Sequence, residues 1–379
     1  MGTHSRLSPS AASRWVACPG SVTLSERYPE SPGSSSESAA EGTASHWVGE
    51  QLLLGQPAPT PGTRCPENGV VLSMEMIDGA YEYAGVVRQV AENVVTTQLH
   101  VEDRLVIKEI HSECFGTVDC WFYLNYKSEI HIFDYKYGWQ CVDPRENWQL
   151  LCYAMGVVEK LHITMLTPPV TIVLHIVQPR PHHALGTHRE WRLSHDELIG
   201  YVIKLRRAAM DALGGAPQAH SGEHCKYCRA RHACPALGQA AMIAVDYACQ
   251  AQPDDLSPGA MALEYRTLER VAALVKARLS GHEARMIGTM QAGGSIPGYS
   301  LESGYGRLAW TRPVAEVIAL GEMMGVTLDA PGVITPTAAR KLGLSDAVLA
   351  AYSGKEKTGV KLVAAAGSKA ALAFAPQGV

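Results

Sequence analysis

The sequence predicts a mixed α/β protein, because segments with helical periodicity alternate with segments rich in β-branched and aromatic residues. Along the chain the predicted order is helix, β-hairpin, helix and strand. A chain of 379 residues is long enough for one large core with an appended domain, or for two domains. Its composition, 46% hydrophobic and 18% charged, is that of a soluble globular protein.

Three helices are predicted ahead of the first strand. They cover residues 8–28, 38–54 and 74–98, and Cys18 lies near the end of the first. The stretch 31–38, SPGSSSES, is rich in Ser, Pro and Gly and therefore predicts a flexible linker or loop.

The sheet is predicted from a strand over residues 101–110 and from the β-hairpin that follows it. The hairpin strands are Phe115 to Asn125 and Ile130 to Tyr137, and the polar residues 126–129 form the loop between them. Residues 170–178, VTIVLHIVQ, are apolar almost throughout and predict a buried strand.

Two further helices lie on either side of this last strand in the sequence. Residues 147–160 are helical, and Ser194 with Glu197 forms a capping box for a helix that reaches Leu213. We expect a first domain over residues 1–245, a long connecting helix over 246–290, and a small C-terminal part over 291–379. This Gly- and Ala-rich extension carries no motif that indicates chemistry, and we expect it to be mainly helical.

Three polar side chains of the hairpin are predicted to share one face. If Asn125 pairs with Ile130, Asp119 falls opposite Lys136. Because side chains alternate between the two faces of a strand, Asp119, Asp134 and Lys136 then point to the same side. Two carboxylates and a lysine in this arrangement suit a divalent metal ion held against a phosphodiester.

The ten cysteines are unevenly placed, and three of them are clustered. Cys225, Cys228 and Cys234 lie in HCKYCRARHACP, where a metal site is the expected use in a reducing compartment. Their fourth ligand would be His224, His232 or a distant cysteine. Zinc suits such a mixture, whereas the proline after the last thiol is typical of ferredoxin-type cysteine runs. Six scattered cysteines are expected to be small buried hydrophobes: Cys65, Cys114, Cys120, Cys141, Cys152 and Cys249.

The net charge of −4 does not by itself indicate a nucleic-acid partner. A nuclease needs only local positive charge, and the carboxylates of a metal site count against the total. Residues 204–231 are locally basic, but on charge alone a solvated surface explains them. No apolar run approaches the roughly 20 residues that span a bilayer, and the N-terminus lacks the apolar core of a signal peptide. We therefore expect a cytoplasmic protein, inside a bacterial host, with no membrane association.

Five short motifs follow one another along the chain. Four are spaced pairs, and the fifth joins Cys18 in ACPGS to the three clustered thiols downstream. The pairs are Gly42 and His46, Gly116 and Asp119, Asp134 and Lys136, and Gln149 and Tyr153. In this order and structural context the chain resembles the RecB-like branch of the PD-(D/E)XK nucleases, and within it a group of phage-encoded proteins. The resemblance covers roughly residues 8–237.

The resemblance implies a restriction-endonuclease-like fold, with a central mixed sheet flanked by helices. It implies that His46, Asp119 and Asp134 bind one or two Mg²⁺ or Mn²⁺ ions, with the backbone carbonyl of Tyr135 as a further ligand. Lys136 would orient the attacking water or stabilise the transition state. Gln149 and Tyr153 would position the DNA backbone or the hydrolytic site.

Several of these nucleases carry an iron–sulfur cluster held by one N-terminal and three C-terminal cysteines. Cys18 with Cys225, Cys228 and Cys234 matches that split arrangement. We therefore expect a cysteine-ligated 4Fe–4S cluster, with Zn²⁺ as the alternative. Its expected role is to clamp the N-terminal helix to the far end of the nuclease domain, without redox catalysis.

The implied function is that of a metal-dependent DNA nuclease, specifically an exonuclease that resects DNA ends in phage recombination or replication. A single-strand annealing protein would be the natural partner. Two alternatives stay open. One is a non-catalytic DNA-binding or assembly module that keeps the nuclease fold, against which the intact Asp134-x-Lys136 argues. The other is a nuclease that acts on RNA or on DNA–RNA hybrids.

Overall fold

A computed structural model describes residues 5–28, 37–92, 98–164, 169–249, 256–310, 312, 314–328 and 335–364. The chain divides into two compact units, residues 1–282 and 283–379. The linker predicted over residues 31–38 lies outside the described residues except for its last two, which already belong to a helix. Among the described helices, none combines the length and the apolar character that crossing a membrane requires.

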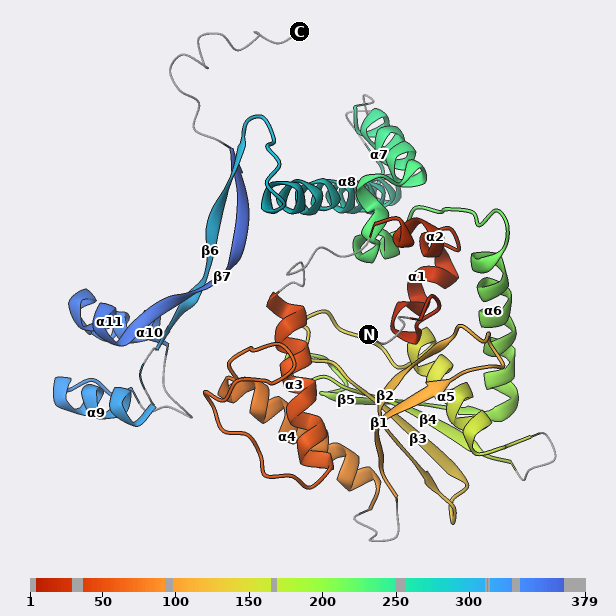
Figure 1. Ribbon diagram of the computed structural model, residues 1–379, viewed down its shortest axis with the longest axis horizontal. Coiled ribbons are helices and arrows are strands. Elements are labelled where there is room, and N and C mark those ends of the chain that lie inside the picture. The colour runs from red at the N-terminus through yellow and green to blue at the C-terminus, as the bar shows by residue number, and fades with distance from the viewer. Residues whose placement is uncertain are drawn as a thin grey trace. The chain divides into compact units, whose positions relative to one another are not determined.

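The first unit is built on a five-stranded mixed sheet in the order β1-β2-β3-β4-β5 (Figure 1). Strands β3 and β4 run parallel, and the other neighbours run antiparallel. The strands are β1 (His100–Val106), β2 (Phe115–Leu124), β3 (Glu129–Tyr135), β4 (Thr171–Val177) and β5 (His188–Ser194). Strand β4 is buried over all but its first residue, as its apolar run predicts.

Helices cover both faces of this sheet, so the predicted α/β architecture with a central mixed sheet is confirmed (Figure 1). Helices α3 and α4 pack on one face, and α1, α5 and α6 pack on the other. The helices up to this point are α1 (Ala12–Ala17), α2 (Ser21–Glu26), α3 (Glu37–Leu53), α4 (Met74–Val90), α5 (Trp148–Lys160) and α6 (His195–Leu213). The short 3-10 turn η1 (Pro9–Ala11) precedes α1. Two more 3-10 turns, η2 (Glu223–Tyr227) and η3 (Arg229–His232), follow α6 and precede the helices α7 (Pro235–Ala248) and α8 (Pro258–Gln291).

Local sequence signals place several helix ends correctly. Ser194 and Glu197 form the predicted capping box, in which the Ser194 hydroxyl accepts from the Glu197 backbone N–H at 3.2 Å. The single helix predicted over residues 8–28 is wrong, because the chain turns at Cys18, Pro19 and Gly20 between α1 and α2. Proline cannot continue the hydrogen-bonding pattern of a preceding helix, and it disfavours helical geometry at the residue before it.

The hairpin register differs from the predicted one by two residues. Leu124 pairs with Glu129 and Trp121 with Ile132, so the loop is residues 125–128 rather than 126–129. Extending this register sets Asp119 opposite Asp134, not opposite Lys136. A shift by an even number of residues leaves every side chain on its predicted face.

Strand β5 was not predicted from the sequence. Its seven residues, HREWRLS, form an edge strand that, among the described strands, pairs with β4 alone and alternates buried and open positions. Arginine and glutamate side chains occupy exposed positions of this strand, so its sequence holds few of the β-branched and aromatic residues from which a strand is predicted. This strand brings His188 and Glu190 next to the buried β4.

The described residues of the second unit form an antiparallel pair of long strands and three short helices. Strands β6 (Tyr299–Trp310) and β7 (Ser353–Ala364) pair with each other, and the helices are α9 (Val314–Met324), α10 (Pro336–Lys341) and α11 (Asp346–Tyr352). The expectation of a mainly helical extension is therefore wrong. The strands are rich in Gly, Ser and Lys, so neither helical nor strand periodicity is marked in the sequence.

Candidate functional site

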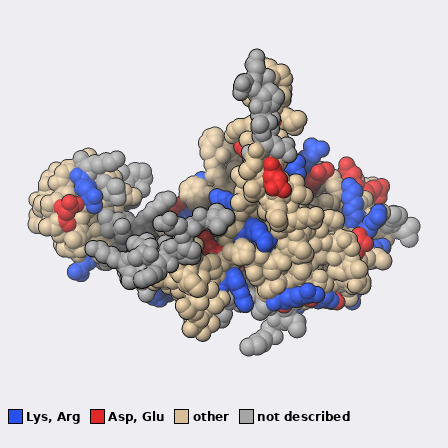
Figure 2. All heavy atoms as spheres, turned by 90° about the horizontal axis from the view of Figure 1, so that it is seen from above, with Lys and Arg blue, Asp and Glu red and all other residues tan. Residues whose placement is uncertain are grey.

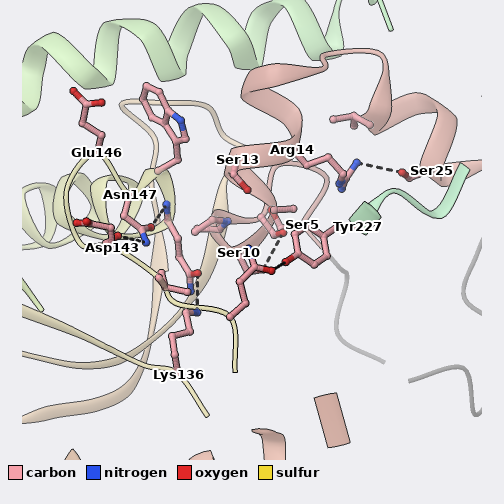
Figure 3. A pocket seen from close by; sticks show the side chains of 18 of the residues that line it. Ser5, Ser10, Ser13, Arg14, Ser25, Lys136, Asp143, Glu146, Asn147 and Tyr227 are labelled. Carbon is pink, nitrogen blue, oxygen red and sulfur yellow. Dashed lines mark hydrogen bonds between the residues drawn. The ribbon is translucent and has the colours of Figure 1, made fainter. Parts of the chain in front are cut away.

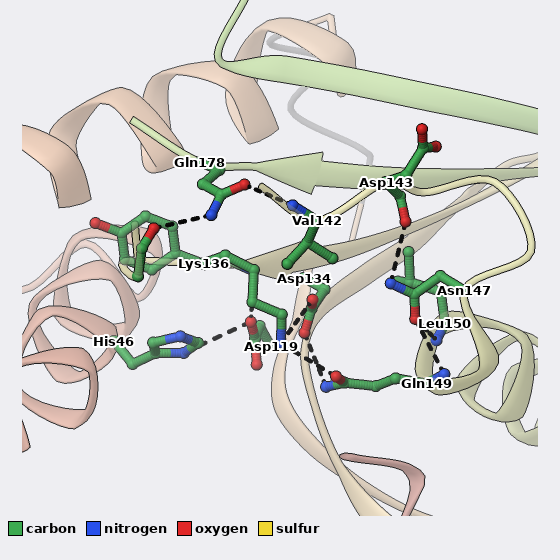
Figure 4. Close-up of polar contacts among 12 residues, drawn as sticks. His46, Asp119, Asp134, Lys136, Val142, Asp143, Asn147, Gln149, Leu150 and Gln178 are labelled. Atoms are coloured by element: carbon green, nitrogen blue, oxygen red, sulfur yellow. Dashed lines mark hydrogen bonds and ion pairs between the residues drawn. The ribbon is translucent and has the colours of Figure 1, made fainter. Parts of the chain in front are cut away.

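Asp134, Lys136 and Gln149 form one connected polar group at the end of β3 (Figure 4). The Gln149 amide donates to Asp134 Oδ1 at 2.9 Å, and its oxygen accepts from Lys136 Nζ at 3.1 Å. Gln149 stands in the first turn of α5, whose N-cap Asn147 accepts from the Gln149 backbone N–H at 3.0 Å. The helix start therefore fixes where the bridging amide is presented.

Asp134 is a buried carboxylate with one oxygen that is poorly satisfied. Oδ2 has Lys136 Nζ at 2.9 Å as an ion pair, yet among the described residues it has no hydrogen-bond donor of acceptable geometry. Burial raises the pKa of Asp134 above its usual range, against the opposing charge of Lys136. A buried anionic oxygen of this kind is where a cation is stabilised best.

Lys136 is half-buried beside two carboxylates. The loss of hydration disfavours its charge, but the carboxylates of Asp134 and Asp119 outweigh that cost and raise the pKa of Lys136. The side chain is therefore a permanent cation, held by Gln149 and by the ion pair with Asp134.

Asp119 connects the hairpin to helix α3. Its Oδ2 accepts from the Tyr135 backbone N–H at 2.7 Å and lies 3.5 Å from His46 Nδ1 (Figure 4). His46 comes from α3, so a residue of an early helix and three residues of the hairpin do meet at one place. The charges of Asp119 and His46 both act on the buried Asp134.

Glu102 of β1 belongs to the same site, although the sequence argument did not select it. Ligand atoms of His46, Glu102 and Asp119 all lie within 4.8 Å of one another. The residue as a whole is exposed, but loss of hydration at the carboxyl and the neighbouring charges of Asp119 and Glu50 raise the pKa of Glu102 to about 8. Its backbone has a φ of 48°, a conformation that non-glycine residues adopt at a cost and that clusters at functional sites.

The two tyrosines of the predicted site lie differently. The Tyr153 side chain is buried and its hydroxyl reaches the first strand of the hairpin, 3.2 Å from where a Cβ on Gly116 would stand. The Tyr135 side chain turns to the α3/α4 face instead, where its hydroxyl lies 2.8 Å from Ser45 Oγ. Only the backbone of Tyr135 is therefore near Asp119.

A polar cavity of about 960 Å³ opens beside Lys136 and Gln149 (Figure 3). Its wall joins the N-terminal segment, the loop before α5 and the turn that carries Tyr227. The charged lining consists of Arg6, Arg14, Lys136, Arg145 and Arg229 against Glu26, Asp143 and Glu146. A cavity with more cations than anions in its lining, Lys136 among them, suits an anionic substrate.

Basic and acidic side chains are mixed on the face seen in Figure 2. There Lys and Arg form several separate groups, with Asp and Glu among them. This mixture agrees with the net charge of −4. At the candidate site, basic side chains line the cavity beside Lys136.

Cys18 and the three clustered thiols lie in one region, and all four are buried free thiols. The His220 backbone N–H is 3.2 Å from Cys18 Sγ, which docks the turn after α1 onto the segment that leads to Cys225. The guanidinium of Arg14 lies close enough to Cys18 and Cys228 to interact electrostatically with both. The described residues contain two groups of three side chains whose potential ligand atoms all lie within 4.8 Å of one another, and neither group includes a cysteine. The four thiols are therefore not arranged as closely as the ligands of a zinc site.

The scattered cysteines divide into two kinds. Cys65, Cys114, Cys120 and Cys152 are buried, as expected. Cys141 and Cys249 are exposed, so the prediction of burial is wrong for these two, which lie on a loop and at a helix end.

The fold and the site define a mixed α/β protein in which two helices, α3 and α5, bring a histidine and a glutamine to the acidic end of a hairpin. The chain belongs to the DUF2800 family, described as a protein of unknown function, which it matches over residues 4–343. The match includes the whole five-stranded sheet and all four cysteines discussed above.

Proposed function

We propose that this protein is a metal-dependent DNA nuclease of the RecB-like branch of the PD-(D/E)XK superfamily, with a restriction-endonuclease-like core. The observation that carries the proposal is the convergence of His46 from α3, Asp119 from β2, Asp134 and Lys136 from the end of β3, and Gln149 from α5. The strand alternation of the hairpin and the motif order select these residues in the sequence, and chance matches would not be expected to bring the pair His46–Asp119 next to the bonded group Asp134–Lys136–Gln149.

The donor set fits a hard divalent ion. Asp119 and Glu102 offer carboxylate oxygens and His46 an imidazole nitrogen, all mutually within 4.8 Å. Asp134 is not part of this group of three, and its poorly satisfied Oδ2 faces Lys136. Carboxylates suit Mg²⁺ and Mn²⁺, and the imidazole shifts the preference toward Mn²⁺. When bound, such an ion would neutralise charge on the scissile phosphate and make water more acidic.

The chain's own residues divide the remaining work. Lys136 would donate to a non-bridging phosphate oxygen or hold the attacking water, because its ammonium is fixed and permanently charged. Gln149 orients Lys136 and Asp134 at once through its two amide atoms. The basic side chains along the cavity would hold the DNA backbone on the way to these groups.

Alanine substitutions test the proposal. Asp119→Ala and Lys136→Ala should abolish cleavage of DNA with Mg²⁺ or Mn²⁺ while DNA binding persists. Lys127→Ala is the matched control, since Lys127 lies in the hairpin loop and pairs with Glu92 away from the site. A wild-type protein that binds DNA but cuts no DNA with either ion would favour the non-catalytic assembly module instead.

The proposed reaction is exonucleolytic resection of DNA ends, in phage recombination or replication, with a single-strand annealing protein as partner. This specific assignment rests on the family resemblance. Linear duplex DNA should be degraded and closed circular DNA spared. Parallel assays on RNA and on DNA–RNA hybrids separate the proposal from a nuclease that prefers these substrates.

We also propose that Cys18, Cys225, Cys228 and Cys234 hold a 4Fe–4S cluster. The four thiols are buried in one region, and backbone N–H groups reach two of them: His220 to Cys18 at 3.2 Å and Gly222 to Cys225 at 3.4 Å. Hydrogen bonds to sulfur are among the features that tune such clusters. The cluster would tie the turn after α1 to the segment after α6.

Metal analysis of protein purified without oxygen tests this second proposal. We expect a brown protein that absorbs near about 400 nm, with iron lost in Cys228→Ser and kept in Cys249→Ser, the exposed control. A colourless protein that contains zinc in place of iron would contradict the cluster but leave the nuclease proposal standing.

A further inference from the structure

The sheet carries a second group of metal-ligating side chains. The register pairs His175 of β4 with Glu190 of β5, and His188 lies two residues before Glu190 on the same face. His175 stacks on Phe133 with ring centroids 4.2 Å apart. Phe133 points to the face opposite to that of its neighbour Asp134, and the group shares no residue with His46, Glu102 and Asp119 of the candidate nuclease site.

The imidazoles of His175 and His188 present nitrogens to each other. Nδ1 of His175 lies 2.9 Å from Nε2 of His188 and 3.8 Å from Oε2 of Glu190. Ligand atoms of the three residues all lie within 4.8 Å of one another. A metal–nitrogen bond of about 2.0–2.1 Å sets two adjacent ligand nitrogens about 2.9–3.4 Å apart. The observed spacing therefore needs little movement to accept an ion.

A chain of hydrogen bonds determines which nitrogen of His175 is available. Glu129 can only accept while ionised, and its Oε2 lies 3.3 Å from His131 Nε2, which must therefore carry the proton. His131 Nδ1 then accepts from His175 Nε2 at 3.0 Å. This leaves Nδ1 of His175 unprotonated and aimed at His188. Ligand histidines in metal sites are oriented in the same way, by donating their other N–H.

The stacking on Phe133 and the fully buried position of His175 hold its ring in place.

The surrounding charges leave one carboxylate oxygen for an ion. Arg192 binds Glu129 Oε1 at 2.7 Å and Glu190 Oε1 at 3.1 Å, so Oε2 of Glu190 is the oxygen turned toward His175. The His175 side chain is 0% exposed and that of Glu190 is 42% exposed. The group therefore opens to solvent on one side, which offers an entry path and room for a water ligand.

We propose that His175, His188 and Glu190 bind a divalent transition-metal ion of the zinc type. Two imidazoles and one carboxylate are a donor set for such ions and not for Mg²⁺ or Ca²⁺. The ion would fasten the edge strand β5 to the buried strand β4, because its ligands come from both. The site is independent of the proposed nuclease activity.

Zinc titration of the full-length, metal-stripped protein tests the site, with stoichiometry and affinity measured by calorimetry and by competition with a chromophoric chelator. The variants are His188→Ala and Glu190→Gln. His182→Ala is the control, an exposed histidine of the β4–β5 connection. Comparison with the wild type is needed because thiols elsewhere also bind zinc.

We expect His188→Ala to lose one bound zinc, Glu190→Gln to bind that zinc at least about 10-fold more weakly, and His182→Ala to match the wild type. Far-UV circular dichroism checks the fold of each variant. If His188→Ala does not fold, the exposed Glu190→Gln decides the question by itself. Unchanged stoichiometry and affinity in a folded variant would overturn the proposal and leave a metal-free chain of neutral histidines.

Discussion

Glu102 and Asp119 lie opposite each other across strands β1 and β2, between the pairs Val101–Cys120 and Asp103–Val118. Their carboxylates and the His46 imidazole are close enough to share an ion. Loss of hydration, followed by repulsion from Asp119, raises the pKa of Glu102. The acidic pair, rather than either residue alone, defines this side of the site.

Glu102→Gln should weaken Mn²⁺ binding and remove part of its pH dependence. In the metal-free protein the pKa of Glu102 is raised to about 8, so a proton competes with the ion below that pH. Wild-type affinity should therefore rise as the pH increases through 8, and the rise should be smaller in the variant. Calorimetric Mn²⁺ titrations between about pH 6.5 and 9 measure both effects. Equal pH profiles would show that Glu102 is not a ligand.

Gln149→Ala should reduce DNA cleavage by about 10²-fold, because Lys136 and Asp134 lose the side chain that orients both. Gln149→Glu keeps an acceptor for Lys136 but sets a carboxylate against Asp134 Oδ1, so it should not restore activity. Gln140→Ala is the matched control, since this glutamine lines the same cavity but bonds to Lys226 and Tyr227. Rates under single-turnover conditions decide; near wild-type cleavage by Gln149→Ala would remove the bridging role.

Gly116→Ala should destabilise the protein by about 1–3 kcal/mol. The new Cβ would stand 2.9 Å from Pro9 Cδ and 3.2 Å from Tyr153 Oη, so η1 or the tyrosine must move. Gly200→Ala in helix α6 is the control. Among the described residues nothing lies within 4 Å of its new Cβ, and the change should stabilise by about 0.5–1 kcal/mol. Chemical denaturation measures both, and equal shifts would contradict the close approach at Gly116.

Ser194→Ala should cost about 1 kcal/mol of stability through the lost cap of helix α6. Its partner Glu197 has a pKa below the usual range because the Ser194 backbone N–H and hydroxyl donate to its carboxylate. The contribution of Glu197 is therefore present above its unfolded pKa and is lost as the pH falls through the folded value. Denaturation of Glu197→Gln at pH 7 and near about pH 3 should show a stability deficit only at the higher pH. An equal deficit at both would show that the charge plays no part.

Much of the architecture was predictable because it rests on local chemistry. The apolar run of β4, the capping box of α6 and the alternation along the hairpin each appear in a short stretch of sequence. The sequence likewise places His46, Asp119, Asp134 and Gln149 on the elements that the structure shows, whereas Lys136, expected inside the second hairpin strand, follows directly after it. These signals depend on periodicity and on neighbouring residues, which the sequence states directly.

What the tertiary structure alone decided depends on contacts between distant segments. Glu102 joins the site because of the register between β1 and β2. Strand register is weakly encoded in the sequence, as the two-residue error in the predicted register of the neighbouring hairpin shows. The edge strand β5, hidden by its charged residues, determines that His175 meets His188 and Glu190. The sequence by itself therefore indicated His46, Asp119, Asp134, Lys136 and Gln149 as candidates, whereas packing and strand pairing decided which residues meet and added Glu102, His175, His188 and Glu190. The reason is that the free energies of strand pairing and packing depend on contacts between segments that are distant in the sequence.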